Sequence, residues 1–297
     1  MFNNKFLLYI AQADAYCLPT KFVKNAPKDF WDRFLKFDKY QHKSNKIYTN
    51  NNFGKYSDNT ILSYAVAETL LEDTYTKDKF ADSFVRCFNY NKRKSFTKKL
   101  QDLLEASKAG PDLISNMKEL STSNEAVTRA ISLGMIKDIG EMLDATELQA
   151  SITNYDNGIS ASLIIALVSH YHIYNLGPTD KHSLLEFIFE YFDGIGFLKY
   201  KWEGPVIGPN LGMNTVHAVI DILTSSNDML EILKKAIMLT GDTNAIAATT
   251  CGIASFKYEQ ELPSFFLKDL EIENINYGIN YLLNLGTGLC YKFKHLP

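Results

Sequence analysis

The stretch that decides the fold lies in the last quarter of the chain and reads Thr240-Gly241-Asp242-Thr243-Asn244-Ala245-Ile246-Ala247-Ala248-Thr249-Thr250-Cys251-Gly252. Asp242 stands at an expected helix N-cap, because its side-chain oxygens can accept the free backbone N–H groups of a first turn. The following side chains are mostly very small, which lets neighbouring backbones approach closely. The stretch therefore predicts a capped helix that is the most buried helix of the protein.

A second stretch, much earlier in the chain, is built in the same way and reads Tyr56-Ser57-Asp58-Asn59-Thr60. Ser57 is its expected N-cap, and residues 61–72 repeat apolar side chains at the i, i+3, i+4 spacing of a helix. Two such helix starts brought together would concentrate carboxylate and amide oxygens, as in a hard-cation or phosphate site. Taken alone, each stretch is more simply explained as an ordinary capped helix.

The helical period recurs along the rest of the chain, at residues 80–88, 96–104, 126–135, 138–143, 159–174, 183–192, 216–223, 230–238 and 246–256. Few runs show the strict alternation of a half-buried strand, so the expected class is all-α. Glycine and proline turns separate the periodic runs, and we find no internal repeat and no linker-like segment. The sequence predicts one compact domain over residues 1–297.

Composition excludes some partners. The chain has 297 residues, 46% of them hydrophobic, and a net charge of −3, which gives no reason to expect a nucleic-acid or membrane partner. The apolar run near the start is too short to span a bilayer and has no cleavage signal. The four cysteines show no paired spacing and are expected to be reduced. These features predict a cytoplasmic protein.

Four short elements, in the same order, resemble the motifs of the ADP-ribosylglycohydrolase family. They are Ala13-Asp14-Ala15-Tyr16-Cys17-Leu18-Pro19-Thr20-Lys21, Ser57-Asp58-Asn59-Thr60, Ser123-Asn124-Glu125-Ala126-Val127-Thr128-Arg129 and Gly241-Asp242-Thr243-Asn244-Ala245. The family carries Gly-Asp-Ala-Leu-Gly-x-Pro-x-Glu, Thr-Asp-Asp-Thr, Gly-Asn-Gly-Ala-Ala-Met-Arg and Gly-Asp-Thr-Asp-Thr there. The resemblance covers about residues 7–258. It implies an orthogonal helical bundle that acts on ADP-ribose or an ADP-ribosylated protein.

The same resemblance implies two divalent cations, held by oxygens of the second and fourth elements and assisted by the Glu that ends the first. The metal-ligand candidates on that pattern are Ser57, Asp58 and Asp242, whereas Asn59, Asn244 and Ala245 replace usual ligands and Lys21 replaces the Glu. Mg²⁺ prefers an octahedron of oxygens whose charge compensates its own. We therefore expect Mg²⁺, the family's cofactor, to bind weakly or not at all.

Lys21 offers a fixed charge in place of the metal. Its ammonium group can neutralise Asp58 and Asp242, or it can point to solvent as lysines commonly do. If the ammonium group neutralises these two acids, the catalytic candidates are Lys21, Asp58 and Asp242. Asp14 is expected to cap the backbone amides of a tight turn and to take no part in chemistry.

The third element supplies candidates for contact with ADP-ribose. Ser123 and Glu125 stand where the family has glycines that let the backbone approach a diphosphate, while Asn124 is retained. Asn124 and Ser123 are therefore substrate-binding candidates, and Asn154 is a third because it stands where the family has a His. The alternative is structural, since Thr122 and Glu125 have the spacing of a capping box.

The sequence leaves three functions open. The first is a hydrolase that releases ADP-ribose from N- or O-glycosidic bonds. The second is an inactive relative that recognises an ADP-ribosyl group, a nucleotide or a protein partner. The third is a changed, metal-independent reaction in the same cleft, with Lys21 as the fixed positive charge. Metal-activated water needs bound metal, so the magnesium-dependent form of the first is ranked below the other two combined.

Overall fold

The computed structural model describes residues 2–24, 27–41, 54–192, 202, 204–208, 211–258, 260–272, 274 and 276–294. Its α-helices are α1 (Phe6–Cys17), α2 (Lys28–Phe34), α3 (Asp58–Leu70), α4 (Lys77–Tyr90), α5 (Lys98–Ala106), α6 (Gly110–Asn116), α7 (Ile139–Ala150), α8 (Asn157–Tyr174), α9 (Lys181–Tyr191), α11 (Leu211–Ser225), α12 (Met229–Met238), α13 (Thr243–Ala254), α14 (Phe265–Lys268) and α15 (Ile279–Lys294). Two 3-10 helices are η1 (Leu18–Thr20) and η2 (Thr128–Met135).

The predicted all-α class is confirmed. In the described ranges β-structure is limited to two isolated bridges, Ser121 with Asn154 and Val206 with Gly241. None of the helices in these ranges has the length and apolarity needed to cross a bilayer. Buried apolar side chains from α1 to α15 form one cluster. The single domain over residues 1–297 stays a prediction.

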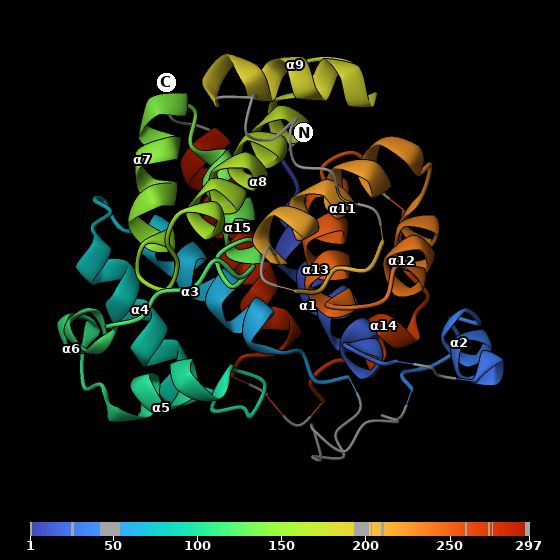
Figure 1. The fold of residues 1–297 in the computed structure, drawn as a ribbon, viewed down its shortest axis with the longest axis horizontal. Helices are drawn as coiled ribbons and strands as arrows, with labels where there is room; N and C mark the ends of the chain where they lie inside the picture. Colours follow the sequence, from blue (N-terminus) through green and yellow to red (C-terminus); the bar gives the residue numbers. More distant parts are fainter. Residues whose placement is uncertain are drawn as a thin grey trace.

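Helices α1 and α13 form the centre of the fold (Figure 1). Every residue of both helices is buried, so the prediction of a fully buried helix after Asp242 is confirmed, with α1 as its equal. At Gly252 of α13 a Cβ atom would lie 2.6 Å from Cγ1 of Ile10 in α1. The small side chains of α13 are therefore what lets the two helices pack so closely.

Two helix starts differ from their predictions. Ser57 caps α3 as expected, because its Oγ accepts from Asn59 N at 3.2 Å. Asp242 stands at the N-cap position of α13 but makes no side-chain capping bond, since its carboxylate is used elsewhere. The predicted helix start at Thr122 is wrong: residues 121–127 form a bridge and turns, and 3-10 helix η2 begins at Thr128.

The backbone around Gly241 brings two distant segments together. Gly241 has a φ of 84°, and a Cβ there would lie 2.2 Å from the carbonyl oxygen of Val206, so the position requires glycine. Asp242 N donates to that same Val206 oxygen at 2.9 Å, and Phe22 N donates to Gly241 O at 2.7 Å. These bonds hold the start of α13 beside the segment that carries Lys21.

Candidate functional site

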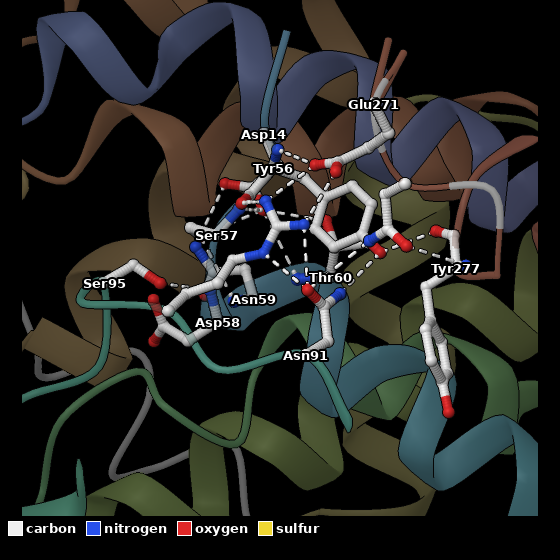
Figure 2. Close-up of polar contacts among 12 residues, drawn as sticks. Asp14, Tyr56, Ser57, Asp58, Asn59, Thr60, Asn91, Ser95, Glu271 and Tyr277 are labelled. Carbon is white, nitrogen blue, oxygen red and sulfur yellow. Dashed lines mark hydrogen bonds and ion pairs between the residues drawn. The ribbon is translucent and has the colours of Figure 1, made fainter. Parts of the chain in front are cut away.

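Asp14 joins helices α1, α3 and α13 at one buried point, and Figure 2 shows it beside Ser57 and Thr60. It lies in the last turn of α1 and accepts from Ser57 N at 2.8 Å and from Ser57 Oγ at 2.7 Å. Its carboxylate also accepts from Thr60 Oγ1 at 2.7 Å and from Asn244 Nδ2 of α13 at 2.9 Å. We call Asp14, Ser57, Thr60 and Asn244 the Asp14 network. Asp14 accepts hydrogen bonds from backbone amides as predicted, and these amides belong to the start of α3. The prediction that Asp14 begins a tight turn is wrong, because Asp14 lies inside helix α1.

Lys21 lies beside the start of α13. Its Nζ is 3.1 Å from Asp242 Oδ1, and the two side chains are only 12% and 4% exposed. Asn124 Nδ2 donates to the other oxygen, Asp242 Oδ2, at 2.9 Å and also to Thr215 Oγ1 at 3.1 Å. The structure thus places Lys21 against a carboxylate and not in open solvent.

Asp58 is the first residue of α3, and its backbone N donates to Ser95 Oγ at 2.9 Å. Burial is the main cause that raises the pKa of Asp58 to about 7; Lys21 lowers this pKa, and Asp14 and Asp242 raise it. Asp58 is therefore protonated at a much higher pH than an ordinary carboxyl group. We call Lys21, Asp58, Asn124 and Asp242 the Lys21 cluster.

We expect Asp58→Asn to stabilise the protein at high pH. Folding raises this acid's pKa from 3.8 to about 7, so the destabilising contribution grows as pH rises from about 4 and is complete above pH 7. Removing the acid should increase the free energy of unfolding by up to about 4 kcal/mol at pH 8, because each unit of pKa shift corresponds to about 1.4 kcal/mol, and by much less near pH 4. Urea titrations at both pH values check this; equal effects at the two pH values would contradict it.

Besides Asp242 Oδ1, which lies 3.1 Å from Lys21 Nζ, three buried polar atoms at this site lack a hydrogen-bond partner among the described residues. They are Asp58 Oδ1, Asn59 Nδ2 and Asn244 Oδ1. An unsatisfied buried polar group costs about 1–3 kcal/mol, so such groups normally have a partner. Two acceptors and one donor together match hydroxyl groups, which can give and accept a hydrogen bond. These atoms therefore point to a hydroxyl-bearing ligand or to water.

The three substrate-binding candidates, Ser123 and Asn124 of the third element and Asn154 further along the chain, occupy different depths. Ser123 is partly exposed, Asn124 is buried, and Asn154 is fully buried. Asn154 Nδ2 donates to the carbonyl oxygens of Ser121 at 3.1 Å and of Ser123 at 2.9 Å. Asn154 thus holds the 121–124 loop from behind, and it positions Asn124 instead of facing open solvent.

A buried ion pair fixes the segment that leads into α3. Arg93 Nη1 lies 2.6 Å from Glu271 Oε1, and Nη2 lies 2.7 Å from Oε2. Tyr56 lies between them: its N donates to Glu271 Oε1 at 2.9 Å, and its carbonyl oxygen accepts from Arg93 Nη1 at 2.7 Å. The Tyr56 hydroxyl donates to Tyr277 O at 2.7 Å (Figure 2). This pair holds the backbone directly before Ser57 and Asp58.

Sequence reasoning missed this pair and did not anticipate the surroundings of Glu125. Arg93 and Glu271 are single charges far apart in the chain, and no local pattern indicates that they meet.

Glu125 Oε1 accepts from Thr97 Oγ1 at 3.2 Å. Burial raises the pKa of Glu125, while Arg129 and Lys21 lower it. The sequence signal for Glu125 was that an acidic residue stands where the family has a glycine.

The donor set does not fit a pair of divalent cations. Among the described residues, no group of three or more His, Cys, Asp or Glu side chains could hold a metal ion. Ser57 Oγ and Asn244 Nδ2 donate to Asp14, and Ala245 offers only a methyl group. The Lys21 ammonium contacts Asp242, where a second cation would be repelled.

Comparison with known proteins identifies the family. The family model described as ADP-ribosylglycohydrolase matches residues 7–285. The chain belongs to the ADP-ribosylglycohydrolase family. A solved structure titled "ADP-ribosylglycohydrolase-related protein complex" is similar with a TM-score of 0.66 at 18% identity, covering 98% of this chain and 97% of that one. A search of curated proteins found no match. The match extends beyond residue 258, where the sequence resemblance was expected to end.

Proposed function

We propose that this ADP-ribosylglycohydrolase family member binds an ADP-ribosyl group at the Lys21 cluster, with the Lys21 ammonium supplying the positive charge. The observation that carries the proposal is the contact of Lys21 Nζ with Asp242 Oδ1 at 3.1 Å in a nearly buried position. Family membership supports the ligand class. The unpartnered atoms of Asp58, Asn59 and Asn244 support a ligand that carries hydroxyl groups, as ribose does.

The arrangement favours a ligand that is anionic and also rich in hydroxyl groups. Lys21 lies against Asp242, and its ammonium group carries a fixed positive charge that attracts a phosphate group. Asn124 keeps Asp242 oriented, and Asn154 keeps the loop of Asn124 in place. The enzymatic form of this proposal is that the protein hydrolyses N- or O-glycosidic ADP-ribosyl bonds.

Titration calorimetry in EDTA tests the proposal directly. We expect ADP-ribose to bind the wild-type protein and Lys21→Met to weaken that binding by about tenfold or more, as for the loss of a charged hydrogen bond. Lys21→Arg keeps the charge and is the matched control. If ADP-ribose fails to bind at millimolar concentration, the site is not an ADP-ribosyl site and the protein is better regarded as a helical interaction scaffold.

Addition of Mg²⁺ should leave the protein almost unchanged. Because stabilisation by a ligand follows the logarithm of its concentration over its dissociation constant, ~1 mM Mg²⁺ should shift the melting temperature by less than about 1 °C. The variant Lys21→Glu, Asn59→Asp, Asn244→Asp, Ala245→Thr restores the family's ligands and should gain a clear Mg²⁺-dependent shift. Micromolar binding of two Mg²⁺ ions by the wild type would contradict the proposal.

A further inference from the structure

Phe22 stands in a turn whose backbone favours glycine. The turn runs from Thr20 to Val23, and Val23 N donates to Thr20 O at 3.3 Å. Lys21 has a φ of −58° and a ψ of 122°, and Phe22 has a φ of 53°, as in a type II turn. The third position of such a turn needs a positive φ, which glycine adopts freely and which strains a residue that has a side chain. A phenylalanine therefore makes this turn less stable than a glycine would.

The hydrophobic core does not account for this ring. Phe22 is 37% exposed, and it is not among the described apolar side chains that form the buried cluster or pack against it. Its backbone is nevertheless fixed, because Phe22 N donates to Gly241 O at 2.7 Å. Strained residues cluster at sites where the strain serves a function. What the ring contacts therefore has to explain its presence.

The Phe22 ring lies against the ammonium group of Lys21. Lys21 Nζ is 5.5 Å from the centroid of the ring, within the range of a cation–π contact. The same Nζ is 3.1 Å from Asp242 Oδ1. A lysine side chain has much rotamer freedom to lose, so a second contact helps to keep it in one place. A ligand that meets an ammonium group already held in place does not have to immobilise it, which strengthens binding.

We propose that Phe22 is a positioning residue of the ADP-ribosyl site, and that its ring holds the Lys21 ammonium group in place for the ligand. The inference rests on the proposed function. Asp242 attracts the ammonium group with a full negative charge, whereas the ring attracts it without adding a charge that would repel a phosphate group. The ring thus lets the site hold its cation firmly and still present it to an anion.

Binding of ADP-ribose to matched variants tests the role of the ring. Phe22→Leu removes the ring and keeps an apolar side chain, whereas Phe22→Tyr keeps the ring. Titration calorimetry in EDTA should show about three- to tenfold weaker binding for Phe22→Leu, and binding within about twofold of wild type for Phe22→Tyr. In the Lys21→Met background Phe22→Leu should weaken binding no further, because the ring acts through the ammonium group. Tyr291→Leu, at an exposed ring of α15, is the control and should bind normally.

Two further readouts need no ligand. The ring current of Phe22 should shift the NMR signals of the Lys21 ε-methylene protons upfield, and Phe22→Leu should abolish this shift. Phe22→Gly should melt about 2 °C or more above Phe22→Ala, because both lack the ring and only glycine adopts the positive φ without strain. The first readout reports the contact with the ammonium group, and the second reports the strain of the turn.

The possible failures are distinct. Equal weakening by Phe22→Leu in the wild type and in the Lys21→Met background would show that the ring acts independently of the ammonium group, and would overturn the inference. Unchanged affinity of Phe22→Leu, an unshifted Lys21 signal, or a glycine variant no more stable than the alanine variant would overturn it as well; in these cases the proposed function stands if the wild type binds ADP-ribose. Failure of the wild type to bind ADP-ribose would refute the proposed function, and the role of Phe22 in binding with it.

Discussion

Replacing Lys21 by Met is expected to lower the free energy of unfolding by about 3–5 kcal/mol at pH 8, the range for removing one partner of a buried ion pair. Lys21 and Asp242 are 12% and 4% exposed, so the variant would leave Asp242 as a buried charge without its cation. Asp58 would lose the same favourable electrostatic influence, because Lys21 lowers its pKa. Chemical denaturation at several pH values measures the effect.

The size of this effect should depend on pH. Asp58, with a pKa of about 7, is protonated at pH 5. Fewer negative charges then interact with the Lys21 ammonium, so Lys21→Met should lower the free energy of unfolding by less. The double variant Lys21→Met, Asp242→Asn removes both charges and should recover most of the lost stability. If Lys21→Met is neutral and the double variant is no more stable, the ammonium does not compensate these carboxylates.

Glu271→Gln is expected to be equally costly, by about 3–5 kcal/mol, because it leaves the Arg93 guanidinium buried without its anion. The Glu271 side chain is fully buried and that of Arg93 is 12% exposed, and both oxygens of the carboxylate are engaged. The change also weakens the acceptor for Tyr56 N, so the backbone that leads to Asp58 loses support. Thermal melting together with ADP-ribose titration would show both consequences.

The chain offers a matched control for the second prediction. Lys98 and Asp102 form an ion pair of 3.0 Å in which the side chains are 88% and 57% exposed. Exposed pairs of this kind contribute little, so Asp102→Asn should change the free energy of unfolding by less than about 0.5 kcal/mol. If Glu271→Gln were as mild as this control, the buried pair would not be what holds the Tyr56 segment.

The amino-acid sequence by itself determined the features that depend on neighbours along the chain. The helical period predicted the all-α class, and the N-cap at Ser57 was predicted from residue type alone, because a cap is completed by the next turn of the same helix. The small side chains after Asp242 predicted the buried helix α13, since only a close neighbour makes them favourable. The four motif elements predicted the family that the comparison confirms.

Only the tertiary structure decided which of these local possibilities were used. Asp242 has the residue type of a cap, but its carboxylate binds Lys21 and Asn124 from other parts of the chain. The box of Thr122 and Glu125 does not start a helix, because the 121–124 loop is bonded to Asn154 behind it. Local sequence contributes backbone preferences of up to about 1 kcal/mol per residue, whereas leaving a buried charge without its partner costs about 3–5 kcal/mol. Contacts between such charges arise from packing, which no single segment contains.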